Sequence, residues 1–139
     1  MQVAIAGLGN MGGKIIKPIQ TAPEVTAVHG FDPNPERRTA AREKYGITVH
    51  DSYRSLVENP EIRLIFIAAP NHEHCRLTLE ALEAGKAVMC EKPMATTLED
   101  AERMVATAER LGGYLQIGFE LRYSQLYRMV KERIDAGLI

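Results

Sequence analysis

Two kinds of segment alternate along this chain, and the alternation restricts the folds that it can adopt. Short apolar runs, of which residues 64–69 form the most apolar, alternate with longer stretches that carry an apolar residue at every third or fourth position. Strands that are apolar throughout are typical of a parallel sheet covered by helices on both faces. We expect strands over residues 3–6, 25–31, 47–49, 64–69, 87–90 and 114–117, and helices over residues 11–20, 36–45, 52–58, 72–84, 97–111 and 121–136.

Individual residues predict where several of these helices begin and end. Pro18 lacks an N–H and crowds the preceding turn, so it should bend or shorten the first helix. Asn71 can cap the fourth helix, and Thr96 or Thr97 can start the fifth. Gly112-Gly113 is expected to end the fifth helix.

The composition is that of one ordinary globular domain. The chain has 139 residues, of which 45% are hydrophobic, and a formal net charge of −1, which excludes a disordered chain. With 17 basic and 18 acidic residues and no basic run, we expect no nucleic acid among its partners. Cys75 and Cys90 each lie in an apolar stretch and do not resemble a disulfide scaffold. Because the chain has no charged start and no long apolar run, we expect a cytoplasmic protein without a membrane partner.

The turn after the first predicted strand has the glycine spacing of a dinucleotide-binding loop. Its sequence is Gly7-Leu8-Gly9-Asn10-Met11-Gly12. The first glycine permits a sharp turn, the second lets a pyrophosphate approach the backbone, and the third allows the helix to pack closely on the strand. The N-terminus of the following helix offers N–H groups to the phosphates. The alternative is a tight turn with nothing bound.

Asp32 supports the binding interpretation and bears on the choice of cofactor. It lies at the end of the second predicted strand, where its carboxylate can accept hydrogen bonds from the hydroxyls of the adenine ribose. Its charge would repel a 2′-phosphate, which favours NAD. Arg37 and Arg38 could accept that phosphate, or could lie on a solvated helix face, so NADP is the alternative. These features predict an α/β domain with a Rossmann-type, doubly wound, parallel six-stranded sheet and helices on both faces.

A second set of polar residues follows the predicted strand at residues 87–90. Glu91 and Lys92 come directly after apolar residues, at the edge of the sheet where open α/β proteins bind ligands. The alternative is an exposed turn before the next helix. His72 and His74 lie in the first turn of the preceding helix, and no third ligand accompanies them, so we expect no metal site.

Three longer segments give the chain a family resemblance. They are Ala68-Ala69-Pro70-Asn71-His72-Glu73-His74, Ala84-Gly85-Lys86-Ala87-Val88-Met89-Cys90-Glu91-Lys92-Pro93 and Gly118-Phe119-Glu120-Leu121-Arg122-Tyr123. In this order after the glycine loop, they resemble the N-terminal half of the glucose–fructose oxidoreductase, inositol dehydrogenase and rhizopine-catabolism (Gfo/Idh/MocA) family of nicotinamide-dependent oxidoreductases. The resemblance covers essentially the whole chain, and Glu-Lys-Pro at residues 91–93 is its most specific motif.

The resemblance implies roles for individual residues beyond the glycine loop and Asp32. The residues that it adds to the cofactor site are Ala69, Pro70, Asn71, His74, Glu91 and Lys92. Glu91 and Lys92 would lie beside the nicotinamide, and the bond between Lys92 and Pro93 is often cis in the family. Lys92 would be the catalytic residue that orients the substrate and tunes proton transfer from the reacting hydroxyl.

The resemblance also implies more protein than these residues. Relatives continue into a second α/β domain, which supplies most of the substrate pocket and usually the catalytic His or Asp. We therefore expect residues 1–120 to form a dinucleotide-binding domain and residues 121–139 a helix that leads to a second domain absent from this chain.

The sequence leaves three functions open. In the first, the parent protein transfers hydride between a nicotinamide cofactor and a sugar, cyclitol or related polyol, and this chain alone turns over no substrate. In the second, the chain is a stand-alone, non-catalytic dinucleotide-binding module for sensing or assembly. In the third, it belongs to an NAD-dependent glycosidase. The sequence determines neither the particular substrate nor the oligomeric state.

Overall fold

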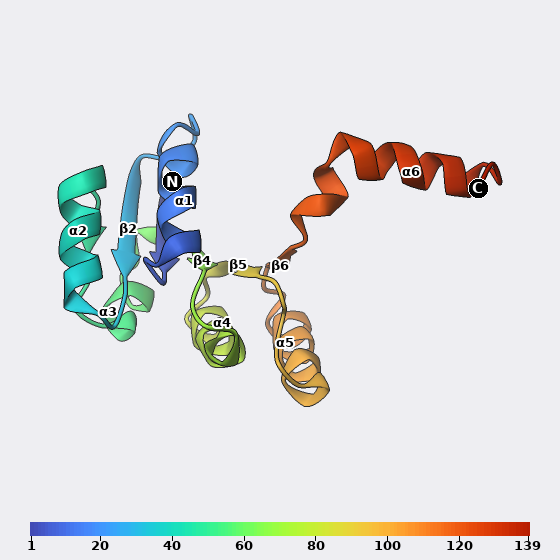
Figure 1. Ribbon diagram of the computed structural model, residues 1–139. Coiled ribbons are helices and arrows are strands. Elements are labelled where there is room, and N and C mark those ends of the chain that lie inside the picture. Colours follow the sequence, from blue (N-terminus) through green and yellow to red (C-terminus); the bar gives the residue numbers. More distant parts are fainter.

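A sheet of six parallel strands forms the centre of the computed structural model, which describes all 139 residues (Figure 1). The strands are β1 (Gln2–Ala6), β2 (Ala27–Phe31), β3 (Thr48–Val49), β4 (Ile62–Ile67), β5 (Ala87–Glu91) and β6 (Leu115–Gly118). Their order across the sheet is β3-β2-β1-β4-β5-β6, and every neighbouring pair is parallel. This is the strand order of a doubly wound Rossmann sheet, so the predicted fold class is confirmed.

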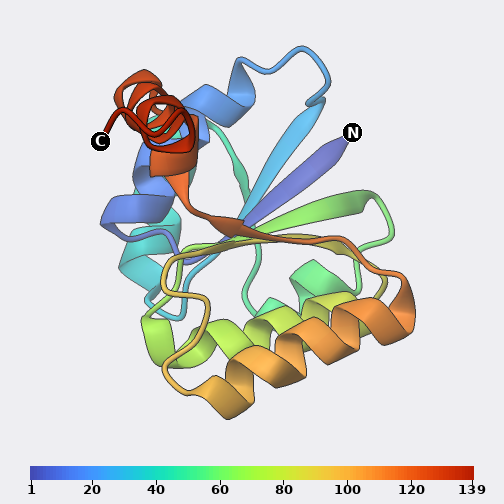
Figure 2. The same cartoon turned by 90° about the vertical axis from the view of Figure 1, so that its right-hand side faces the viewer.

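Helices cover both faces of the sheet (Figure 2). One face carries α1 (Asn10–Gln20) and α2 (Pro35–Tyr45), and the other carries α3 (Tyr53–Val57), α4 (His74–Glu83) and α5 (Leu98–Leu111). The chain changes face at the crossover from β3 to β4, which also carries it from one half of the sheet to the other. The crossover leaves a crevice between the loops that follow β1 and β4, where such folds bind ligands.

Alternation along β1 divides the core into two layers. Val3 and Ile5 pack with residues of α1 and α2, whereas Ala4 and Ala6 pack with residues of α3, α4 and α5. Successive side chains of a strand point to opposite faces, so a central strand with helices on both sides must be apolar throughout. All four of these side chains are at most 1% exposed.

Some of the predicted helix boundaries are confirmed and others are wrong. Thr97 caps α5 by accepting a hydrogen bond from the N–H of Asp100, and Gly112 ends that helix with a φ of 58°. Asn71 caps nothing, because a 3₁₀ turn, η1 (Asn71–Glu73), precedes α4 and the Pro70 carbonyl accepts the N–H of Glu73. Pro18 does not shorten α1, which continues to Gln20, because the proline falls in the last turn of the helix.

Two segments differ from the predicted boundaries where the chain leaves the sheet. β4 ends at Ile67, and the apolar residues Ala68 and Ala69 turn toward the glycine loop instead of extending the strand. The last helix begins later than predicted, because a 3₁₀ turn, η2 (Glu120–Tyr123), comes before α6 (Gln125–Asp135). In both places the sequence pattern is longer than the strand or helix that forms.

The last helix stands apart from the other layers. α6 extends away from the sheet, and none of its residues is buried (Figure 1). Its apolar side chains are therefore left without a layer to pack against. None of the helices combines the length and the apolar character that crossing a membrane requires.

Candidate functional site

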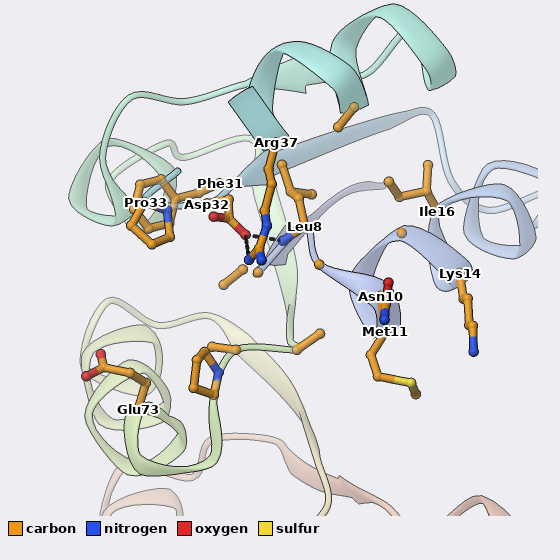
Figure 3. Close-up of a pocket in the computed structure, with 18 of the residues that line it drawn as sticks. Leu8, Asn10, Met11, Lys14, Ile16, Phe31, Asp32, Pro33, Arg37 and Glu73 are labelled. Atoms are coloured by element: carbon orange, nitrogen blue, oxygen red, sulfur yellow. Dashed lines mark hydrogen bonds and ion pairs between the residues drawn. The ribbon is translucent and has the colours of Figure 1, made fainter. Parts of the chain in front are cut away.

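A cleft of about 1340 Å³ opens where the chain leaves β1, β2 and β4. Eight of the residues predicted for the cofactor site line it: Gly7, Leu8, Gly9, Asn10, Met11, Asp32, Ala69 and Pro70. Figure 3 shows the loop after β1 facing the loop after β4 across this cleft. The cleft therefore lies at the carboxyl ends of the central strands, where open parallel sheets bind ligands.

The protein itself requires two glycines of the loop. Gly7 has a φ of 98°, and a Cβ on it would lie 2.5 Å from the Ala68 carbonyl oxygen. A Cβ on Gly12 would lie 1.8 Å from the Gly7 carbonyl oxygen. The first glycine thus permits the turn that brings the β1 and β4 loops together, and the third lets α1 pack against that turn.

Gly9 is different, because no protein atom requires a glycine there. The nearest atom to a Cβ on Gly9 would be a guanidinium nitrogen of Arg37 at 3.6 Å, an ordinary contact with the end of a flexible side chain. Gly9 also precedes α1, and no side chain caps that helix. The backbone N–H groups at the start of α1 therefore face the cleft without a side-chain acceptor, as a phosphate site requires. This arrangement fits a pyrophosphate held close to the backbone.

Asp32 connects the end of β2 to the glycine loop. One carboxylate oxygen accepts the N–H of Leu8 at 2.8 Å and the other accepts the N–H of Asn34 at 2.9 Å. Only 2% of Asp32 is exposed. Its carboxylate is held in one orientation at the cleft wall, as an acceptor for ribose hydroxyls should be.

The two arginines after Asp32 have different roles. Arg37 lines the cleft, and its guanidinium lies 3.5 Å from the Asp32 carboxylate (Figure 3). Arg38 turns away, because it donates to the backbone carbonyls of Asp32 and Pro33 and pairs with Asp51. Arg37 is therefore the arginine that can meet a ligand bound at Asp32.

The second half of the predicted site comes from the loops that follow β4 and β5. Asn71 and Lys92 are exposed, and Glu91 is half-buried at the end of β5. Lys92 makes no hydrogen bond and no ion pair, so its ammonium is free. The bond between Lys92 and Pro93 is cis, as the family resemblance implied. Gly12, Asn71, His74, Glu91 and Lys92 are the predicted residues that do not line the cleft.

His74 lies behind the site. It is 1% exposed, and its two ring nitrogens lie 2.9 Å from the Ala69 carbonyl oxygen and 2.8 Å from the Pro93 carbonyl oxygen. Unlike Asp32, His74 does not line the cleft, and both of its ring nitrogens face backbone carbonyls of the protein. His72, by contrast, is exposed at the cleft, and no group of three or more His, Cys, Asp or Glu side chains could hold a metal ion.

Several residues of the cleft were not predicted from the sequence. The main ones are Lys14 and Lys17 of α1, Tyr45 of α2, Tyr53 of α3, and Glu73 and Arg76 near the start of α4. The two lysines lie three positions apart in the helix that follows the glycine loop. That spacing places them on one side of the helix and could have indicated a face turned to the ligand.

A doubly wound sheet, a glycine loop that opens a helix and an acid at the end of β2 together define a dinucleotide-binding domain. A family described as an oxidoreductase family with an NAD-binding Rossmann fold matches residues 1–119. The chain therefore belongs to the Gfo/Idh/MocA oxidoreductase family, which confirms the resemblance and the expected nicotinamide dinucleotide.

Two of the relatives that this chain resembles are dehydrogenases. Inositol 2-dehydrogenase of Salmonella typhimurium is 33% identical to this chain, and the match covers all of this chain and 43% of that protein. A 1-carboxy-3-chloro-3,4-dihydroxycyclohexa-1,5-diene dehydrogenase of Comamonas testosteroni is 34% identical over 99% of this chain and 35% of its own length.

The solved structures agree. Scyllo-inositol dehydrogenase of Lactobacillus casei, with bound NAD(H) and scyllo-inositol, superposes with a TM-score of 0.90 at 27% identity over all of this chain and 42% of that chain. Myo-inositol 2-dehydrogenase of Lactobacillus plantarum also has a TM-score of 0.90, at 28% identity and the same coverage. This chain thus spans less than half the length of the relatives that it matches.

Proposed function

We propose that this chain binds NAD and is the cofactor-binding part of a dehydrogenase that oxidises a hydroxyl group of an inositol or a related polyol. One observation carries the binding proposal. Gly9 is a glycine that no protein atom requires, at the uncapped start of α1 and at the edge of the cleft. The polyol is proposed from the relatives, several of which are inositol dehydrogenases.

The chain's own residues divide the cofactor between two halves of the sheet. The glycine loop and the start of α1 would hold the pyrophosphate, and Asp32 would hold the ribose next to the adenine. Ala69, Pro70 and Asn71 after β4, with Glu91 and Lys92 after β5, would hold the nicotinamide half. The nicotinamide would supply the hydride acceptor for the carbon that bears the reacting hydroxyl.

We propose that Lys92 is the residue of this chain that contacts the substrate. Its ammonium is exposed and has no partner, so it can donate a hydrogen bond to the reacting oxygen and orient it. No His, Asp or Glu side chain of residues 1–139 forms an ion pair or hydrogen bond with Lys92 to relay the proton. Lys92 also lies outside the cleft that the glycine loop lines. We therefore propose that this chain binds the cofactor without turning over substrate.

The domain organisation is part of the same proposal. The family match ends at Gly118-Phe119, just before η2. This agrees with a cofactor domain over residues 1–120, from which η2 and α6 lead toward the substrate-binding part of the parent protein.

Calorimetric titration of the 139-residue chain tests the proposal. NADH, NAD⁺ and ADP-ribose should each bind with one-to-one stoichiometry, whereas UDP-glucose, which has a pyrophosphate but no adenosine, should bind more weakly. Myo-inositol, scyllo-inositol and glucose, each added with NAD⁺, should give no steady rise in NADH absorbance. If neither NADH nor ADP-ribose bound, the proposed function would be overturned. Steady turnover of a polyol by the purified chain would overturn the proposal that these 139 residues bind the cofactor without turning over substrate.

A further inference from the structure

His74 connects the two loops that form the second half of the proposed site. It is the first residue of α4, and its ring is buried between the loop after β4 and the loop after β5. One nitrogen bonds to the carbonyl of Ala69, directly before Pro70, and the other to the carbonyl of Pro93, directly after Lys92. A single side chain thus spans both loops.

The loop that carries Lys92 has few other polar attachments. Residues 92–96 take part in none of the backbone hydrogen bonds found in the turns and loops of the chain. The contact between His74 and the Pro93 carbonyl is the only side-chain hydrogen bond to this segment. Met94 and Ala95 add apolar packing against the core. Apolar packing is not directional, so the position of the backbone next to Lys92 depends on His74.

The chemistry of the two contacts requires an imidazole. Both partners are carbonyl oxygens, which only accept, so a ring nitrogen that carries a hydrogen can donate it to the carbonyl that it faces. Few other side chains place two nitrogens on opposite sides of a rigid ring, each within reach of one loop. An apolar replacement would remove the donor from a partly buried carbonyl oxygen, which costs more than the loss of an exposed hydrogen bond.

We propose that His74 is a positioning residue, which holds the Lys92–Pro93 loop against the Ala69–Pro70 loop and so orders the nicotinamide half of the cofactor site. This inference rests on the proposed function. Asp32 and the glycine loop follow β2 and β1, and both loops bonded by His74 follow β4 and β5, on the other side of β1. His74 therefore acts on one half of a bound dinucleotide and leaves the adenosine half unchanged.

Titration of two ligands into variants of the full 139-residue chain tests this division. NADH reaches both halves of the site, whereas ADP-ribose lacks the nicotinamide. His74→Phe should raise the Kd for NADH about tenfold and leave the Kd for ADP-ribose within about threefold, since the loss of a donor to a partly buried carbonyl is worth about one such step. His74→Gln, which keeps a donor, should recover part of the NADH affinity and serves if the phenylalanine variant does not fold.

His29→Phe is the matched control. His29 is also buried, at 7% exposure, but it bonds to Gln2 and His50 and touches neither loop. This variant should leave the ratio of the two Kd values unchanged. If the His74 variants weakened both ligands equally, or neither, the positioning role would be overturned. If the unaltered chain bound neither ligand, the proposed function itself would fail.

Discussion

Gly9 and Gly12 belong to the same loop but are constrained by different partners. A Cβ on Gly12 would lie 1.8 Å from a carbonyl oxygen of the protein, whereas a Cβ on Gly9 would touch nothing closer than 3.6 Å. Gly12→Ala should therefore lower the free energy of unfolding by about 2 kcal/mol or more, since the helix must shift. Gly9→Ala should leave it within about 1 kcal/mol but weaken NADH binding about tenfold or more. Urea unfolding and calorimetry measure the two effects.

The informative comparison is between the two variants. A Gly9→Ala chain that binds NADH as tightly as the unaltered chain would show that no phosphate approaches this backbone. Gly13→Ala is a comparison within the same cleft, because Gly13 also lines it but its N–H already donates to the Gly9 carbonyl and its Cβ would meet only the Tyr45 hydroxyl, at 3.8 Å. This control should change neither quantity by much.

Asp32 and Arg37 should set the choice between NAD and NADP. The Asp32 carboxylate is fixed by two backbone N–H groups and would repel a 2′-phosphate, so NAD⁺ should bind more tightly than NADP⁺. Asp32→Asn keeps a carbonyl acceptor but removes the charge. This variant should reduce the difference between the Kd values for NAD⁺ and NADP⁺, because Arg37 would then face the 2′-phosphate without the negative charge of Asp32 beside it. The double variant Asp32→Asn with Arg37→Gln should increase the difference between the two Kd values again.

Arg38→Gln is the control for this pair, since Arg38 bonds to backbone carbonyls and Asp51. Calorimetric Kd values for NAD⁺ and NADP⁺ with each variant decide the matter. Equal or tighter binding of NADP⁺ by the unaltered chain would contradict the role given to Asp32.

Among individual residues, the sequence predicts those whose role depends on their spacing along the backbone. The glycine loop and Asp32 were found because the turn, the helix and the strand that they serve occur at fixed separations. The difference between Arg37 and Arg38 was not predictable, because both follow Asp32 in one helix and only the fold shows which one faces the cleft. The burial of His74 also escaped prediction, since a polar residue in a first helical turn is usually exposed.

Among the elements, β2 and the loop after β3 are connected by a pair of histidines. A ring nitrogen of His29 lies 3.0 Å from one of His50, and the other nitrogen of His29 lies 2.8 Å from the Gln2 amide oxygen. Burial lowers the pKa of His29 below its usual 6.5, and the charge of His50 lowers it further. Burial also lowers the pKa of His50, although the backbone of Ser55 and the charge of Asp51 oppose that change. The pair is therefore packed as neutral rings.

These shifts predict an acid-sensitive edge of the sheet. Below about pH 6.5 the unfolded chain binds protons on both histidines more readily than the folded chain, so the free energy of unfolding falls as the pH drops and recovers above that value. His29→Gln, which keeps a hydrogen-bonding side chain, should reduce the loss of stability at low pH. Urea midpoints measured at about pH 7.5 and about pH 5.5 give the difference.

The exposed His72 supplies the control, because His72→Gln removes a titrating group that lies outside the core. It should leave the pH dependence of the unaltered chain in place. A chain whose urea midpoint stays the same between the two pH values, or rises in acid, would contradict the predicted direction.

Element types were more predictable than element ends. Apolar runs located all six strands, because a strand buried on both faces must be apolar throughout. The same pattern misplaced the end of β4, since the backbone of Ala68 and Ala69 leaves the strand and passes close to Gly7. Asn71 was expected to cap α4, but a backbone carbonyl of the 3₁₀ turn already accepts the N–H of Glu73. Local propensity gave no sign of that contact.

For the whole molecule, the last helix differs from the other five in how it is packed. The helices α1 to α5 each bury residues in one of the two cores, but α6 buries none. Leu126, Met129, Val130 and Ile134 of α6 recur at helical spacing and are 64%, 51%, 40% and 56% exposed. An apolar stripe of this kind gains free energy when a second surface removes it from water, at about 25 cal/mol per Å².

We therefore expect the isolated chain to associate with itself through α6 as its concentration rises. In sedimentation equilibrium the apparent mass should exceed that of the 15.5 kDa monomer and increase with loading concentration. The double variant Leu126→Glu with Ile134→Glu should remain monomeric, because it places charges in the middle of the stripe. Glu132→Lys, a charge reversal at a polar position of the same helix, should still associate. All three chains should bind NADH alike, since α6 supplies none of the residues that line the cleft. A monomeric mass for the unaltered chain at every concentration, or equal association of the double variant, would show that the exposed stripe on α6 does not mediate contact between copies.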